Sequence, residues 1–223
     1  MKEVILDTET TGLFVKDGHR IVEIGCIELE ELVPTKNKFH CYLNPERKVS
    51  EKALEVHGYT DEFLSTQKKF SDIVEEFLNF IKNKTLVIHN AEFDLSHLNN
   101  ELALLGKKKI NSEHVVDTLA LARNKFPGSP TSLDALCKRY KIDNSKRTQH
   151  TALIDCDLLS KVYINLLDQK EPTLNFQSQE GTELKANLND TNRHYKKIIK
   201  PTEEELKLHK EYLKTSLKKN FFN

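Results

Sequence analysis

The stretch KEVILDTETTG, from Lys2 to Gly12, decides what this chain folds into. Its first half, up to Leu6, predicts the start of a buried strand. Asp7 and Glu9 then follow one residue apart, and alternate residues of a strand point to the same face. Two carboxylates that close repel each other unless a cation lies between them. The stretch therefore predicts a cation-binding site at the end of a strand.

Length and composition predict a soluble globular protein. The 223 residues, 38% hydrophobic and 30% charged, suffice for one sizeable domain with a tail or for two small domains. No apolar run is long enough to span a bilayer, and the N-terminus has no signal-peptide pattern. The cysteines lack metal-ligand spacing, so we expect free thiols in a reducing cytoplasm and no membrane contact. They are Cys26, Cys41, Cys137 and Cys156.

The charge of the chain is zero overall but unevenly distributed. Residues 177–223 carry ten Lys or Arg and seven Asp or Glu, a net charge of +3. Residues 1–176 carry the remaining 24 basic and 27 acidic residues, a net charge of −3. A protein that binds nucleic acid by bulk charge is basic. The main domain is instead compatible with an enzyme that contacts phosphates through metal ions.

The order of the expected elements predicts a mixed α/β sheet flanked by helices. Further strands are expected at residues 21–32 and 38–45, and their short connections favour an antiparallel meander. Residues 70–84 have the 3.6-residue apolar period of an amphipathic helix. Strands and helices then alternate: a strand at 85–90, a helix at 91–106, a short strand into a helix at 115–126, and helices at 131–142 and 150–167.

Three short segments carry acids in unusual places. They are the segment at Asp7 and Glu9, HNAEFD at residues 89–94, and HTALID at residues 150–155. Asp94 lies 87 residues after Asp7, and Asp155 lies 61 residues after Asp94. Only tertiary folding can therefore bring the three segments together. Their convergence would form a hard, oxygen-rich pocket of the kind that binds Mg²⁺ or Mn²⁺.

Such a pocket suits phosphoryl chemistry. Two metal ions about 3.5–4 Å apart can polarise an attacking water and stabilise the leaving oxygen of an in-line displacement. His150 would act as the general base, because its ordinary pKa of about 6.5 suits proton removal near neutral pH. The predicted metal ligands are Asp7, Glu9, Asp94 and Asp155.

Each of these residues also has an ordinary interpretation. Asp94 could be a first-turn acid favoured by the helix dipole, and His150 could cap a helix. His89 could tie down the end of a strand. Asp155 is harder to explain this way, because an acid on the buried side of a helix is rarely left unpaired. The conjunction of the three segments favours the metal site.

In that order, DTETTG, HNAEFD and HTALID resemble the three motifs of the DEDDh 3′–5′ exonuclease family. Within it, residues 2–167 are similar to the epsilon, or proofreading, subunits of bacterial DNA polymerase III. Connecting stretches such as VHGYTDEFL and IDNSKRTQHTAL share this similarity. The resemblance implies an RNase H-like mixed five-stranded sheet, two divalent ions held by the four acids, and His150 as the residue that activates water.

The resemblance also implies where substrate lies. The 3′-terminal nucleotide of a DNA strand would rest against EKALEVHG, residues 51–58. The family's histidine matches His57, but the family's acid five positions earlier is Lys52 here, where a backbone contact would survive. The implied substrate-binding residues are Asp7, Glu9, Lys52, His57 and Asp155.

Proofreading fits the rest of the sequence. An unpaired 3′ end separates from its template at lower cost than a paired one. An acidic nuclease domain lacks bulk attraction to DNA and depends on a partner for delivery. The expected substrates are single-stranded or mismatched 3′ termini, and the expected products are nucleoside 5′-monophosphates.

The C-terminal part predicts a tether, with an exonuclease domain at 1–170, a clamp-motif-like segment and flexible linker at 171–200, and a polymerase-binding tail at 201–223. Leu174 and Phe176 form an apolar pair whose position, 171–176, resembles the sliding-clamp motif of the epsilon family. Alternatively, this chain end packs on its own domain.

A helix is expected at 202–219, opened by a capping box of Thr202 and Glu205. Its narrow stripe of Leu206, Leu213 and Leu217 needs a partner to bury it. By resemblance, that partner is the alpha subunit of DNA polymerase III, and tethering would raise the local concentration of the nuclease at the primer end.

Two alternatives remain. One is a free-standing, ribonuclease T-like enzyme that trims nucleic-acid ends, against which the linker and tail helix argue. The other is a non-catalytic polymerase scaffold, against which the complete set of four acids and His150 argues.

Overall fold

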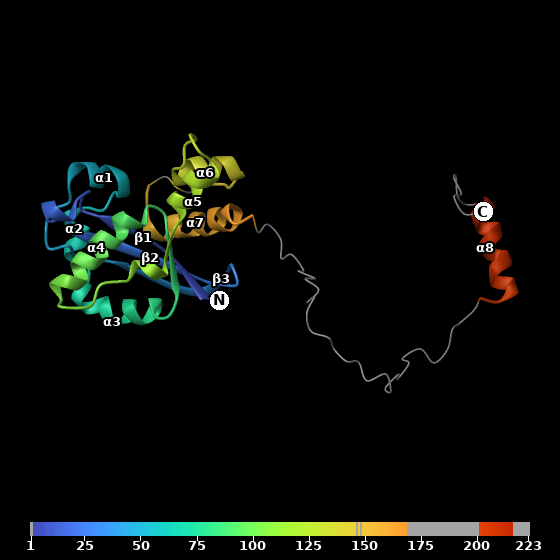
Figure 1. Cartoon of the computed structure of the whole chain (residues 1–223), viewed down its shortest axis with the longest axis horizontal. Helices are drawn as coiled ribbons and strands as arrows, with labels where there is room; N and C mark the ends of the chain where they lie inside the picture. Colours follow the sequence, from blue (N-terminus) through green and yellow to red (C-terminus); the bar gives the residue numbers. More distant parts are fainter. Residues whose placement is uncertain (1, 146, 148, 169–200, 216–223) are drawn as a thin grey trace, which may run out of the picture. The chain divides into compact units, whose positions relative to one another are not determined.

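A computed structural model describes residues 2–145, 147, 149–168 and 201–215 (Figure 1). The chain divides into an N-terminal folded domain and a C-terminal unit, which we describe separately. The expected clamp-motif-like segment and linker lie outside the described residues, and so does the end of the expected tail helix.

The domain is built on one mixed five-stranded sheet, as expected, in the order β3-β2-β1-β4-β5. β1 pairs antiparallel with β2, and β2 with β3, whereas β4 runs parallel to both β1 and β5. In chain order the strands span Lys2–Thr10, Ile21–Glu30, Val33–Tyr42, Thr85–Ile88 and Val115–Asp117.

The third strand differs from the expected 38–45, because it begins at Val33 and ends at Tyr42. Glu31 and Leu32 form the two-residue connection to β2, and both have positive φ angles, of 49° and 64°. A two-residue turn of this kind matches the twist of the flanking strands and pairs them at once. β3 is an edge strand, which accommodates Pro34 without the loss of an inner ladder bond.

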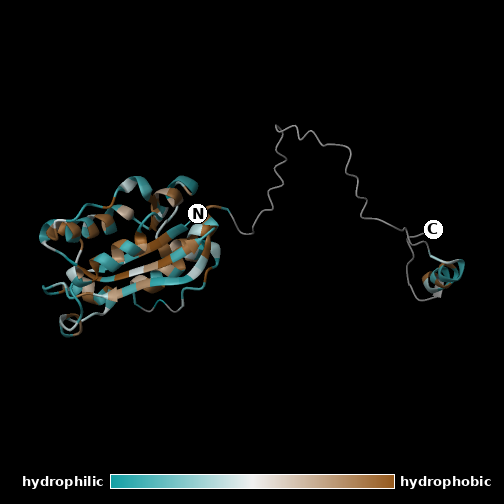
Figure 2. Ribbon diagram, turned by 90° about the horizontal axis from the view of Figure 1, so that it is seen from below, coloured by the Kyte–Doolittle hydropathy of each residue, from teal (hydrophilic) through white to brown (hydrophobic). Residues whose placement is uncertain are grey.

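Helices cover both faces of the sheet (Figures 1 and 2). Apolar side chains of α3 and α4 pack on one face with Val4 and Leu6 of β1, and those of α5, α6 and α7 pack on the other with Ile5. Because strand residues alternate, Asp7 and Glu9 share the face of Ile5. In chain order α1 to α7 span Glu51–His57, Asp61–Ser65, Phe70–Ile81, Ala91–Leu104, Thr118–Lys125, Leu133–Tyr140 and Ala152–Leu166, and two 3₁₀ turns span Val15–Asp17 and Ser112–His114.

The C-terminal unit contains α8, Glu203–Thr215. Its capping box is confirmed: Glu205 N donates to Thr202 Oγ1 at 3.2 Å, and Thr202 N donates to Glu205 Oε2 at 2.7 Å. Leu206 is 44% exposed, so the predicted need for a partner stands as a prediction. Across the described residues, the structure contains no helix long and apolar enough to cross a membrane.

Candidate active site

The expected acids converge on one cleft of about 330 Å³ at the C-terminal end of β1. Asp7 and Glu9 line it from the strand, Asp94 from the first turn of α4, and Asp155 from the first turn of α7. His150 lies at its edge with 44% of its side chain exposed. The structure therefore brings together the five residues predicted to carry the chemistry.

Asp94 is positioned by a sharp turn and by the backbone of β1. Asn90 adopts a left-handed conformation, with φ of 72°, which turns the chain from β4 directly into α4. Asp94 Oδ1 accepts hydrogen bonds from Thr8 N at 3.0 Å and from Thr8 Oγ1 at 2.7 Å. Only 3% of Asp94 is exposed, so these bonds fix a buried carboxylate beside Asp7.

Asp155 and His150 depend on the start of α7, which lies at Ala152 rather than at the expected residue 150. Thr151 is extended and precedes the helix, so His150 belongs to the loop, where its N–H donates to Val56 O at 3.1 Å. The loop geometry keeps the imidazole out of the helix and at the mouth of the cleft.

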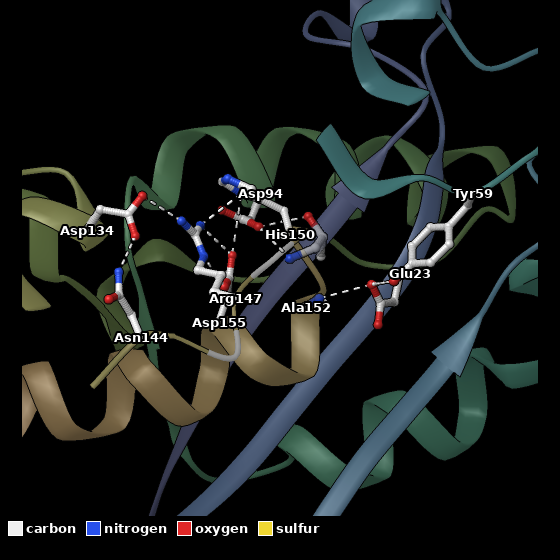
Figure 3. Close-up of polar contacts among 10 residues, drawn as sticks. Glu23, Tyr59, Asp94, Asp134, Asn144, Arg147, His150, Ala152 and Asp155 are labelled. Carbon is white, nitrogen blue, oxygen red and sulfur yellow. Dashed lines mark hydrogen bonds and ion pairs between the residues drawn. The ribbon is translucent and has the colours of Figure 1, made fainter. Parts of the chain in front are cut away.

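Two residues of β2 hold the start of α7, and sequence reasoning missed both. Glu23 is fully buried, and its Oε2 accepts from Ala152 N at 2.9 Å and from Tyr59 Oη at 2.8 Å (Figure 3). Its Oε1 bonds His40 Nε2 at 2.7 Å. A Cβ added to Gly25 would lie 2.6 Å from the carbonyl carbon of Ala152, so only glycine allows this approach.

We expect Gly25→Ala to lower both activity and stability, because the added methyl group must push the start of α7, and Asp155 with it, away from the sheet. The expected loss of stability is about 2 kcal/mol or more. Gly128→Ala is the control: it has a positive φ of 74° but no atom within 4 Å of the added Cβ, so it should cost about 1 kcal/mol and leave activity intact. Equal activity in the two variants would contradict this account of the helix seat.

The crowded carboxylates hold protons more tightly than ordinary acids. Burial, followed by the charge of Asp94, raises the pKa of Asp7 well above its usual range. Burial and the charge of Asp155 raise the pKa of Glu9 to about 8. Burial raises the pKa of Asp94 to about 7, against the opposing effect of the bonds from Thr8. Burial, followed by Arg147, lowers the pKa of His150, which favours the neutral ring.

This donor set fits divalent cations. Ligand atoms of Glu9, His150 and Asp155 all lie within 4.8 Å of one another, and Asp7 and Asp94 line the same cleft. Carboxylate oxygens are the ligands that Mg²⁺ and Mn²⁺ prefer. Burial and the neighbouring negative charges raise the pKa values of these acids. Bound cations would stabilise the same carboxylates in their charged form.

A second pocket of about 540 Å³ adjoins the cleft, and Glu9 and Phe93 line both. Lys52 and His57 line this pocket, on the α1 segment where a nucleotide was expected. His57 Nδ1 accepts from Tyr59 N at 3.0 Å, which places the ring proton on Nε2. That Nε2 is buried and has no hydrogen-bond partner among the described residues.

Arg147 is the main feature of the cleft that the sequence analysis missed. Its guanidinium binds His150 and Asp155, which lie three and eight residues further along the chain (Figure 3). A sequence signal existed, because an arginine in a loop just before a buried acid is a natural partner for it.

His89 has the ordinary role considered for it: its Nδ1 bonds Thr118 Oγ1 at 2.9 Å and ties the end of β4 to α5.

Comparisons with known proteins agree with this geometry. A family model described as Exonuclease, RNase T, matches residues 4–163. The DNA polymerase III subunit epsilon of Rickettsia felis is 46% identical over 98% of this chain and 98% of its own length. The chain belongs to the exonuclease family of DNA polymerase III epsilon subunits. The corresponding subunit of Buchnera aphidicola subsp. Schizaphis graminum is 43% identical over 95% of each chain.

Solved structures place this epsilon-family chain among exonucleases by fold. Exonuclease X in complex with 5′ overhanging duplex DNA is 25% identical, with a TM-score of 0.59 over 75% of this chain and 92% of that one. The nuclease domain of a DEDDh family member bound to rAMP is 19% identical, with a TM-score of 0.66 over 76% and 92%, which shows the fold alone. The predicted RNase H-like fold is confirmed.

Membership of the epsilon family makes the chain a 3′–5′ exonuclease, as predicted. Exonucleases of the DEDDh type generally use divalent metal ions, in agreement with the acidic donor set of the cleft.

Proposed function

We propose that this chain is the proofreading exonuclease of a bacterial replicase, and that it removes mismatched 3′-terminal nucleotides from DNA as 5′-monophosphates by two-metal hydrolysis. The observation that carries the proposal is the convergence of four carboxylates and one neutral histidine beside an open pocket. Asp7, Glu9, Asp94 and Asp155 hold two Mg²⁺ or Mn²⁺ ions. Bound there, the ions supply electrophilic stabilisation of the scissile phosphate and acidify the attacking water.

His150 is the general base in this proposal. Its ring is neutral near pH 7, because burial and Arg147 lower its pKa, so it can take a proton from water. It stands on an extended loop at the mouth of the cleft, with almost half of its side chain exposed, where solvent reaches it.

The pocket beside the cleft receives the terminal nucleotide. Exposed apolar side chains of Leu13, Phe14 and Val56 border it, and such surfaces bind unstacked bases without reading sequence. His57 lines this pocket, and Lys52 contributes a cationic rim. An unpaired 3′ end reaches such a pocket at lower cost than a paired one.

Digestion of a DNA strand labelled at its 5′ end, with a mismatched 3′ end, tests the proposal. With Mg²⁺ or Mn²⁺ the products should form a ladder that shortens from the 3′ end, and a chelator should stop it. Chromatography of the released material should show 5′-monophosphates. Absence of digestion at every metal concentration would reject the exonuclease and favour the scaffold alternative, whereas a marked preference for RNA ends would favour the ribonuclease T-like alternative.

The tail supplies the subunit role. We propose that α8 and its surroundings bind the alpha subunit of DNA polymerase III, that residues 171–176 contact the sliding clamp, and that the complex works in the cytoplasm at the replication fork. The similarity to epsilon subunits extends over 98% of the chain, tail included, which supports this role. Exposed Leu206 and Leu208 offer apolar surface for a partner.

Deletion of residues 177–223 should leave hydrolysis of a single-stranded oligonucleotide intact and abolish binding to the alpha subunit. The reason is that the cleft lies entirely in the N-terminal domain, whereas the unpartnered apolar side chains of α8 are removed. Gel filtration with the alpha subunit measures the binding, and digestion of a free oligonucleotide is the control. Binding at full strength by residues 1–176 would contradict the tether.

A further inference from the structure

Arg147 is a buried cation in the middle of the acidic cleft. Only 7% of its side chain is exposed, and it lines the cleft together with Asp155 and His150. Removal of a guanidinium from water carries a large cost, which only close anionic partners offset. The contacts of Arg147 therefore indicate which groups it serves.

Its guanidinium covers both oxygens of Asp155 (Figure 3). Nε donates to Oδ1 at 2.6 Å and Nη2 donates to Oδ2 at 2.7 Å, the two-pronged geometry that makes arginine–carboxylate pairs strong. Although burial acts against it, the bonds and charge of Asp155 raise the pKa of Arg147, so the cation is permanent. A carboxylate held in this way offers its oxygens to arginine instead of to a metal ion.

The same guanidinium also contacts His150, the predicted general base. Arg147 Nη2 lies 2.8 Å from His150 Nδ1, and a guanidinium can only donate, so Nδ1 accepts. The neutral ring must then carry its proton on Nε2. Neither nitrogen of His150 is free to take a proton while this contact lasts, because one lone pair is occupied and the other nitrogen is already protonated.

We infer that Arg147 is a resident counter-cation, a positioning residue that holds Asp155 and His150 in a closed metal-free arrangement and is displaced when divalent ions bind. The inference rests on the proposed function for the metal ions. Arg147 pairs with Asp155 when no metal is bound, and its departure frees a ligand and a base in one movement.

The structure provides a place for the displaced group. Arg147 Nη1 donates to Asp134 Oδ2 at 2.7 Å, and Asp134 is 54% exposed at the outer side of the cleft. The other oxygen of Asp134 accepts from Asn144 Nδ2 at 3.0 Å, which holds that carboxylate independently of Arg147. The guanidinium can pivot about this outer contact without entering solvent unpaired.

Calorimetric titration of Mn²⁺ into the full chain, stripped of metal and free of substrate, tests the inference. Arg147→Gln should bind Mn²⁺ about tenfold more tightly than the wild type, since no internal cation competes for Asp155. Arg147→Lys keeps the charge but loses the two-pronged geometry, so its affinity should lie between the two. Lys161→Gln is the matched control: it removes an exposed cation of α7 that pairs with Asp157 at 2.7 Å and should change nothing.

Unchanged or weaker Mn²⁺ binding by both folded Arg147 variants would overturn the inference and make Arg147 a support of the metal site. Circular dichroism establishes folding, and Arg147→Lys keeps the test valid if Arg147→Gln does not fold. Because the titration contains no DNA, its result is independent of whether the chain digests a 3′ end.

Nuclear magnetic resonance gives a second readout that a merely structural role would not move. In the metal-free wild type, the ¹⁵N spectrum of His150 should show protonated Nε2 and unprotonated Nδ1. Addition of diamagnetic Mg²⁺ should shift the Arg147 Nε–H signal, assigned by its absence from Arg147→Gln, and should change the ratio of His150 tautomers. An Arg147 signal that stays in place at saturating Mg²⁺ would contradict displacement.

Discussion

Asp7→Asn should abolish the exonuclease and, in chelator, make the protein more stable. Asp7 lies at the centre of the carboxylate cleft, and without its charge the proposed metal site loses a ligand. We expect the rate of 3′-end digestion to fall by at least about 10³-fold, equivalent to about 4 kcal/mol of transition-state stabilisation. Single-turnover digestion of a labelled strand at saturating Mg²⁺ measures this loss.

The gain in stability follows from the raised pKa of Asp7, which burial and then Asp94 cause. A carboxyl whose pKa is higher folded than unfolded binds more protons in the native state, so stability falls as pH rises above about 4. Asparagine carries no charge and removes this penalty. At pH 8 in chelator the variant should be more stable by on the order of 2 kcal/mol, or about 4–8 °C in Tm.

Two comparisons make this prediction specific. The difference in Tm between Asp7→Asn and the wild type should shrink towards pH 4, where both carry a neutral side chain at position 7. Asp157→Asn, on the exposed face of α7, should change neither activity nor Tm by a comparable amount. A variant less stable than the wild type at pH 8 in chelator would show that Asp7 is not held under repulsion.

The sequence could predict the site because strand alternation and motif order are local properties. Asp7 and Glu9 share a face by the two-residue period of β1, and that face carries α7 with Asp155. Asp94 was expected at the same place because it lies one helical turn after the end of β4. These relations hold whatever the details of packing, so the convergence of the four acids and His150 could be predicted before their contacts were known.

The residues that sequence reasoning missed act through tertiary contacts. Glu23 looked like one of several acids in a strand rich in β-branched residues. It is nevertheless fully buried and binds the start of α7, which lies 129 residues further along the chain. Gly25 gave no signal, because its role depends on the approach of Ala152. The beginning of β3 was missed because a two-residue turn of Glu31 and Leu32 lacks the usual glycine or asparagine.

The positive charge beside Asp155 comes from Arg147, which sequence periodicity could not indicate. A loop arginine can pair with any of several acids, and only the folded chain selects among them. The structure therefore adds a positive charge beside Asp155 that the sequence analysis did not include.

His150→Gln should lower the rate of the chemical step by about 10²–10⁴-fold, the usual contribution of a general base. The variant should still bind metal, since the four carboxylates remain. His89→Gln is the matched control within the same cleft: His89 ties β4 to Thr118, so its loss should affect stability more than rate. Equal rate losses in the two variants would reject the assignment of His150 as the base.

The pH dependence separates a base from a merely polar group at position 150. Burial is the first cause that lowers the pKa of His150, and it remains when metal ions bind, so the wild type should stay active below pH 6.5 and lose activity only when the ring becomes protonated. Saturating Mg²⁺ keeps the carboxylates ionised, so their own titration should not produce this limb. If His150 accepts the proton, the pH–rate profile of His150→Gln should show no break at the pKa of His150. Water or hydroxide would then be the proton acceptor for the residual rate. An identical limb in the variant would assign the titration to the carboxylates and leave the proton acceptor elsewhere.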